Sequence, residues 1–175
     1  MHREAYEWVR RHADPDSPSV LDIGGRDING SVRDLFPGAG FYLSLDLVDG
    51  PGVDLVADAA TWQPDVQFHT VVCCEVFEHT PHWPQICHTA FQALRPGGEL
   101  ILTTAGPGRP VHSGVDGGSV LKPGEHYANI DPGELRRTLV DVGFVQVTVD
   151  WQPWPSDVRA YARRPDSPKR RRRHV

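Results

Sequence analysis

The chain has 175 residues, of which 39% are hydrophobic and 23% charged, and this composition excludes a disordered or fibrous protein. A chain of this length buries roughly 70% of the surface that its unfolded form exposes, which is enough for one domain with its own core. Its three cysteines have neither a metal-ligand spacing nor a secreted disulfide pattern, and no stretch is typical of a signal peptide or a membrane span. We therefore expect a cytoplasmic protein.

The net charge of −5 is unevenly distributed. Residues 163–175 hold seven Lys or Arg against one Asp, which leaves 11 basic and 22 acidic side chains in residues 1–162. An acidic body of this kind is a poor surface for nucleic acid. We expect a single domain over residues 1–164 and a basic, disordered tail over residues 165–175, with no partner in nucleic acid or membrane. The sequence does not indicate an oligomeric state.

In the first half of the chain, short strands alternate with turns and helices. Apolar spacing predicts a helix over residues 2–12, and the run SVLDI predicts a buried strand over 19–23 that ends in a glycine turn. A short helix over 31–36 and strands over 41–46 and 53–58 are expected to follow. The near-continuous apolar run over 69–75 is typical of a parallel strand that is covered on both faces.

In the second half, the spacing of apolar side chains over residues 82–94 predicts an amphipathic helix, which is followed by a strand over 99–104. Residues 105–128 are rich in Gly and Pro, and such long structureless stretches are usually lids or binding loops. Asp131 is placed to cap the start of another helix that ends at Gly143, and strands over 144–150 and 157–164 are expected to form a hairpin.

This order of elements predicts an α/β fold. We expect a Rossmann-like, mostly parallel, seven-stranded sheet with helices on both faces and a C-terminal antiparallel hairpin. Ligands in such sheets bind beyond the carboxyl ends of the strands, at the point where the strand order reverses. The candidate site residues are therefore those at the strand ends.

Four strand ends in succession carry acidic side chains. Asp22 leads into the loop that contains Gly24 and Gly25, and Asp46 follows at the separation of an acid that binds ribose hydroxyls. Asp58 and Ala59 end the third strand, where a carboxylate and a backbone N–H can meet an exocyclic amine and a ring nitrogen. Together with Glu75, these acids favour a nucleoside ligand that carries a positive charge.

The runs VLDIGGRDINGSV, LSLDL, VADA, VVCCEVFEH and LRPGGELILTT, in this order, resemble the class I S-adenosylmethionine-dependent methyltransferases. The resemblance covers residues 19 to about 150. It implies that S-adenosylmethionine is the cofactor. Because the acidic body disfavours nucleic acid, we expect a small-molecule acceptor. The glycine loop departs from the family pattern, because Arg26 and Ile28 stand at usually glycine-rich positions. The cofactor-binding residues that the resemblance implies are Asp22, Gly24, Gly25, Asn29, Asp46, Leu47, Asp58, Ala59, Cys74 and Glu75.

A general base is needed for a hydroxyl acceptor and not for a neutral amine or a thiolate. His126 is the first candidate and His79 the second, although each could instead have a purely structural role. The nine histidines show no helical ligand spacing with an acid in place, so we expect no metal site.

Two other functions remain open on the sequence alone. A nicotinamide-dependent oxidoreductase would use the same ribose-binding acid, but it should show a G-x-G-x-x-G loop, whereas this chain has Gly24, Gly25 and Gly30. A non-catalytic scaffold that binds the nucleoside cofactor is the second alternative. It has no evident need for acids at four strand ends.

Overall fold

A computed structural model describes residues 1–167 of the chain. The predicted basic tail, residues 165–175, lies outside the described residues from residue 168 onward. Within residues 1–167, no helix combines the length and the apolar character needed to cross a bilayer.

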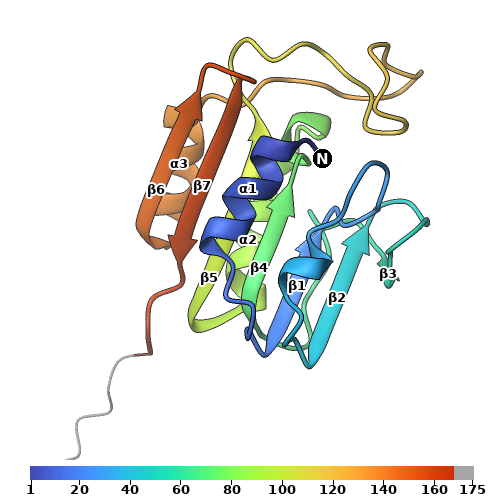
Figure 1. The fold of residues 1–175 in the computed structure, drawn as a ribbon. Coiled ribbons are helices and arrows are strands. Elements are labelled where there is room, and N and C mark those ends of the chain that lie inside the picture. The colour runs from blue at the N-terminus through green and yellow to red at the C-terminus, as the bar shows by residue number, and fades with distance from the viewer. Residues whose placement is uncertain (168–175) are drawn as a thin grey trace, which may run out of the picture.

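Seven strands form one sheet in the order β3-β2-β1-β4-β5-β7-β6 (Figure 1). The strands from β1 to β5 pair in parallel, and β7 is antiparallel to both of its neighbours, so β6 and β7 form the expected hairpin. The strand order reverses between β1 and β4. The strands are β1 (Ser19–Ile23), β2 (Phe41–Asp46), β3 (Leu55–Val56), β4 (Phe68–Cys74), β5 (Leu94–Ala105), β6 (Val145–Gln152) and β7 (Asp157–Arg163).

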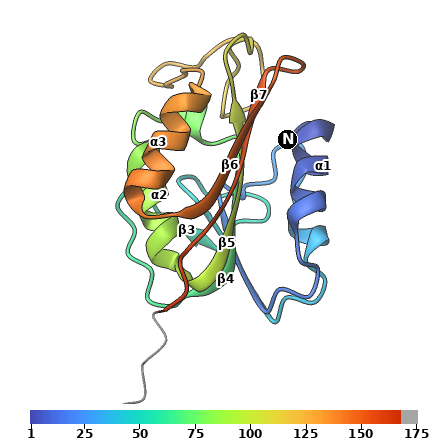
Figure 2. The same ribbon diagram turned by 90° about the vertical axis from the view of Figure 1, so that its left-hand side faces the viewer.

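Helices cover both faces of the sheet, as the sequence predicts. Figure 2 shows α1 (Arg3–His12) on one face and α2 (Trp83–Ala93) with α3 (Pro132–Val142) on the other. Two short 3-10 helices, η1 (Arg33–Leu35) and η2 (Phe77–His79), follow β1 and β4. Asp131 caps α3 as predicted, because its carboxylate accepts a hydrogen bond of 2.8 Å from the backbone N–H of Glu134.

The sheet separates two apolar cores, and β4 contributes to both. Val71 packs in the larger core with Leu100 and Leu139, on the side of α2 and α3. Its neighbour Val72 packs in the smaller core with Val9, on the side of α1. Because alternate side chains of a strand point to opposite faces, the apolar run at β4 supplies buried side chains to both cores. Burial on both faces fixes this strand at the centre of the sheet.

Three elements differ from the sequence-based prediction. The strand expected over residues 53–58 is only Leu55–Val56, and the helix expected over 31–36 is the 3-10 turn Arg33–Leu35. The strand expected over 99–104 begins at Leu94, because the chain passes from α2 into β5 without a loop. The side chain of Arg164 stabilises this junction: its guanidinium donates to the carbonyl of Phe91 at 3.0 Å and lies 4.9 Å from that residue's ring centre. Such tertiary contacts are not visible in a local pattern.

Candidate active site

A cavity of about 290 Å³ opens at the carboxyl ends of β1, β2 and β4, beside the reversal of strand order. Ligand sites in this class of sheet occur at that place. Eight of the predicted site residues line the cavity, namely Gly24, Asn29, Asp46, Leu47, Asp58, Ala59, Glu75 and His79. Apolar side chains complete its wall, among them Ile23, Leu45 and Ile86. An apolar slot rimmed with acids suits a flat base joined to a polar, cationic group.

The loop after β1 approaches the cavity with its backbone. Gly24 has a φ of +77°, and a Cβ atom there would lie 2.1 Å from Cγ2 of Val76. The predicted partners Asp22 and Gly25 lie outside the cavity lining. Asp22 is buried below the loop, where it accepts a 2.8 Å hydrogen bond from the hydroxyl of Tyr42. Burial raises its pKa to about 6. The Asp22 carboxylate lies against the loop, since a Cβ atom at Gly25 would stand 2.7 Å from its Oδ2.

The acids at the ends of β2 and β3 both order their own turns and face the cavity. Asp46 accepts from the backbone N–H of Val48 at 3.0 Å and of Arg26 at 3.3 Å. Asp58 accepts from the N–H of Ala60 at 2.9 Å. A carboxylate has about four acceptor positions, so each retains capacity for a ligand's hydroxyl or amine.

Glu75 follows β4 in a strained backbone conformation, with a φ of +57°. Such strain costs of order 1–3 kcal/mol and is concentrated at functional sites. Two contacts from β5 hold the residue: its N–H donates to the carbonyl of Thr103 at 2.9 Å, and its carboxylate accepts from the Thr103 hydroxyl at 2.9 Å. Burial alone would raise the pKa of Glu75, but the hydrogen bond and charge of His2 outweigh it and lower the pKa. The carboxylate therefore stays ionised at the cavity wall.

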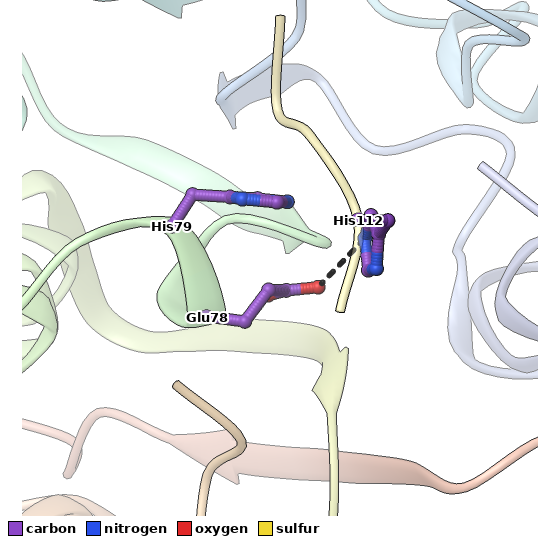
Figure 3. A group of neighbouring side chains, drawn as sticks. All are labelled: Glu78, His79 and His112. Atoms are coloured by element: carbon purple, nitrogen blue, oxygen red, sulfur yellow. Dashed lines mark ion pairs between the residues drawn. The ribbon is translucent and has the colours of Figure 1, made fainter. Parts of the chain in front are cut away.

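Beyond Glu75, three titratable side chains lie close together: Glu78 and His79 from η2, and His112 from the Gly/Pro-rich segment 105–128, which we call the flap (Figure 3). Glu78 is fully buried and accepts from the hydroxyl of Thr104 at 2.7 Å; burial and the charge of Glu75 raise its pKa to about 8. Burial and the charge of His112 lower the pKa of His79 to about 4. Glu78, His79 and His112 have ligand atoms within 4.8 Å of one another, so a metal ion could be held there. The sequence-based expectation of no metal stays a prediction.

The predicted lid, residues 105–128, contributes one wall of the cavity. The stretch beyond β5 contains no helix or strand up to α3 and crosses the strand ends (Figure 1). Its residues His112, Ser113 and Gly114 line the cavity. Ser113 is buried and donates to Glu125 at 3.0 Å, and the Arg26 guanidinium donates to the carbonyl of Gly114 at 2.9 Å. Arg26, the departure from the glycine-rich pattern, thus joins the glycine loop to the flap.

A second cavity of about 350 Å³ adjoins the first. The two share Asn29, Glu75, His112 and Gly117, and the second is otherwise lined by Met1, His2, Arg109, Pro110, Val111 and Ser119. His2 and Arg109 both contact Asp157, which is fully buried at the start of β7, at 3.1 and 2.9 Å. Burial opposes a charge on His2, but hydrogen bonds to Asp157 and Glu75 outweigh it and raise its pKa to about 10. Sequence reasoning missed this second cavity.

Two further predicted residues do not line the first cavity. Cys74 and His126 are both half-buried and lie outside its lining. His112 and Arg109, in contrast, were not predicted as site residues. Both lie in the Gly/Pro-rich flap, where no spacing distinguishes a residue that faces the cavity from one that faces water. The aromatic contacts of His112 with His79 and Tyr127, each with ring centres 5.0 Å apart, depend on the folded flap.

Comparison with known proteins decides the family. A family model described as "Methyltransferase domain" matches residues 1–149 of the chain. The chain belongs to this methyltransferase family. Membership removes the nicotinamide-dependent oxidoreductase from consideration, and it agrees with the resemblance in the strand-end motifs.

Individual relatives of this methyltransferase chain are distant. It is 31% identical over 121 residues to the ubiquinone biosynthesis O-methyltransferase of Xanthomonas euvesicatoria pv. vesicatoria; the match covers 63% of the chain and 50% of that protein. The chain thus spans half the length of this curated relative. Among solved structures, it is similar in fold to phosphoethanolamine N-methyltransferase 2 of Haemonchus contortus in complex with S-adenosyl-L-methionine. The TM-score is 0.69 and the identity 15%, and the match covers 93% of this chain and 52% of that one. An S-adenosylmethionine-dependent methyltransferase of Mesorhizobium loti gives a TM-score of 0.64 with 18% identity, and the match covers 91% of this chain and 98% of that one.

Proposed function

We propose that residues 1–164 form a methyltransferase that takes its methyl group from S-adenosylmethionine and transfers it to a small-molecule acceptor. The observation that carries the proposal is the cavity at the switch point, which brings Asp46, Asp58 and Glu75 from three strand ends to one apolar slot. The net acidic charge of residues 1–162 supports a small acceptor over nucleic acid. A cytoplasmic location stays a prediction.

The proposed cofactor contacts follow the shape of the cavity. Asp46 would accept from the ribose hydroxyls, and Asp58 with the backbone at Ala59 would bind the edge of the base. Leu47 would pack on the base, and the backbone at Gly24 would approach the amino-acid portion. The carboxylate of Glu75 would lie beside the positive sulfonium. When bound, S-adenosylmethionine supplies a methyl group that is already activated for transfer.

The chain's own contribution to catalysis is alignment and exclusion of water. The flap residues from His112 to Val115 cover the cavity, and Arg26 holds them at Gly114. His79 is neutral at physiological pH because its pKa is lowered to about 4, and its Nδ1 is buried with no hydrogen-bond partner among residues 1–167. A neutral imidazole at the cavity wall is compatible with a hydroxyl acceptor, but this nitrogen itself lies against Gly114 and has no exposed surface for a hydrogen bond to one. The name of the Xanthomonas relative, an O-methyltransferase, supports oxygen as the acceptor atom.

The test is a calorimetric titration of the protein with S-adenosylmethionine, S-adenosylhomocysteine and NAD. We expect micromolar binding of both adenosyl ligands and none of NAD. Asp46→Ala should weaken the adenosyl ligands about tenfold or more, since it removes a hydrogen bond from a charged acceptor. The matched control is Asp49→Ala, an exposed acid three positions on that lies outside the cavity lining, which should bind as the wild type does. Equal loss in both variants, or no adenosyl binding, would contradict the proposal.

A further inference from the structure

The second cavity has a basic side chain whose hydrogen-bonding groups are only half used. Arg109 is 17% exposed, and within residues 1–167 its Nη1 donates to Asp157 at 2.9 Å and to the Pro155 carbonyl at 3.2 Å; the protonated His2 lies beside it, with Nε2 3.3 Å from Nη1. Its Nη2 lies 3.9 Å from Glu75, beyond hydrogen-bond distance, and Nε has no partner in the same part of the chain. A guanidinium binds carboxylates and phosphates best through two parallel N–H donors.

The buried contacts of Arg109 hold its guanidinium at the wall of the second cavity. Asp157 is fully buried and accepts from Arg109 on one oxygen and from Arg159 at 3.3 Å on the other. The guanidinium is thereby fixed by one of its nitrogens, so little side-chain entropy would be lost when a ligand binds the others. His2 also faces this cavity as a cation, and its charge is balanced by the carboxylates of Asp157 at 3.1 Å and Glu75 at 3.4 Å.

The position of the second cavity relative to the first decides which molecule would enter it. Glu75 and His112 belong to both linings. If the adenosyl cofactor fills the first cavity with its sulfonium beside Glu75, a molecule in the second cavity meets the methyl group at this shared wall. The second cavity is therefore on the acceptor's side of the reaction.

We infer that the second cavity is the acceptor subsite, and that the free edge of Arg109 binds an anionic group on the acceptor, a carboxylate, phosphate or phosphonate. This inference rests on the proposed function for the identity of the first cavity. It makes Arg109 a specificity-determining residue: acids should be preferred over neutral molecules of the same shape. The amino-acid carboxylate of the cofactor carries the same chemistry, so the experiment separates the two sources.

The test compares Arg109→Lys with the matched control Arg159→Lys. Both variants keep a cation at Asp157, but Arg159 lines neither cavity. Each protein, saturated with S-adenosylhomocysteine, is titrated with inorganic phosphate, with 3,4-dihydroxybenzoate and with the neutral 3,4-dihydroxybenzamide. We expect wild type and Arg159→Lys to bind phosphate, and to bind the benzoate about tenfold more tightly than the benzamide, the effect of hydrogen bonds to a charged group. Arg109→Lys should lose both properties.

Three results would overturn the inference. The first is that the wild type and Arg109→Lys bind phosphate with equal affinity and also bind the benzoate with equal affinity. The second is that both variants lose anion binding equally, which would assign the effect to Asp157. The third is that Arg109→Lys weakens S-adenosylhomocysteine but not 5′-methylthioadenosine, which lacks the carboxylate, because the anion would then be the cofactor's own. If S-adenosylhomocysteine does not bind at all, the proposed function fails, and phosphate binding to the unliganded proteins still tests Arg109.

Discussion

Replacement of Gly24 by Ala tests whether the backbone of the glycine loop is fixed against the turn after β4. The variant has two costs. A left-handed conformation, here φ +77°, costs an L-residue roughly 1–2 kcal/mol. The new methyl group would also stand 2.1 Å from Cγ2 of Val76, and such overpacking typically costs about 1–3 kcal/mol. We therefore expect the free energy of unfolding to fall by about 3 kcal/mol, and the affinity for S-adenosylhomocysteine to fall with it.

Urea denaturation of four variants separates these two costs. Gly124→Ala has a similar φ of +87° and no atom within 4 Å of the added Cβ, so it should lose only the conformational part. Val76→Ala combined with Gly24→Ala removes the colliding methyl group and should recover about 1–3 kcal/mol relative to Gly24→Ala, after correction for Val76→Ala alone. If Gly24→Ala is no more destabilising than Gly124→Ala, the close contact between the loop and Val76 does not exist in solution.

Three other predictions concern stability. Because burial raises the pKa of Glu78 from 4.5 to about 8, the free energy of unfolding of the wild type should fall as the pH rises from 5 through 8. Urea denaturation of Glu78→Gln should show a smaller fall over this pH range, and an equal pH dependence in the two proteins would contradict the prediction. Asp131→Ala removes the N-cap of α3 and should cost about 1 kcal/mol, whereas the exposed Asp141→Ala on the same helix should cost far less; a circular-dichroism melt compares them. Leu139→Ala, at a fully buried position, should cost about 2–5 kcal/mol by the same melt, and a loss below that range would mean that the core of α3 is not packed as described.

The sheet and its flanking helices could be predicted from sequence because each has a local signal. The apolar run at residues 69–75 identifies the central strand, and the cap at Asp131 with the stop at Gly143 bounds α3. The place of Asp46 and Asp58 in the cavity wall could be predicted because parallel strands end at one edge of the sheet. β3 is shorter than predicted, since at the edge of the sheet only two residues, Leu55 and Val56, pair with β2.

The acceptor side could not be predicted, because its residues meet only through long-range contacts. Arg109 reaches Asp157, which lies 48 positions along the chain, and His2 reaches both Glu75 and Asp157. His112 comes to the site from a flap without periodicity. The family resemblance implies Asp22 as a cofactor residue, and this assignment stays a prediction: in the structure its carboxylate accepts a hydrogen bond from Tyr42 and lies outside the cavity lining. Burial of a strand-end acid depends on the neighbouring strand, which local spacing does not describe.

The measurement that tests the central claim most directly is transfer of an isotope-labelled methyl group. The protein is incubated with S-adenosylmethionine labelled in its methyl group and with a small-molecule extract, and labelled products are detected by mass spectrometry. The account predicts label in an acidic acceptor, with S-adenosylhomocysteine formed in equal amount, and loss of both in Asp46→Ala. If the adenosyl ligands bind but the label stays in the cofactor at every extract concentration, the chain is a cofactor-binding scaffold and not a methyltransferase.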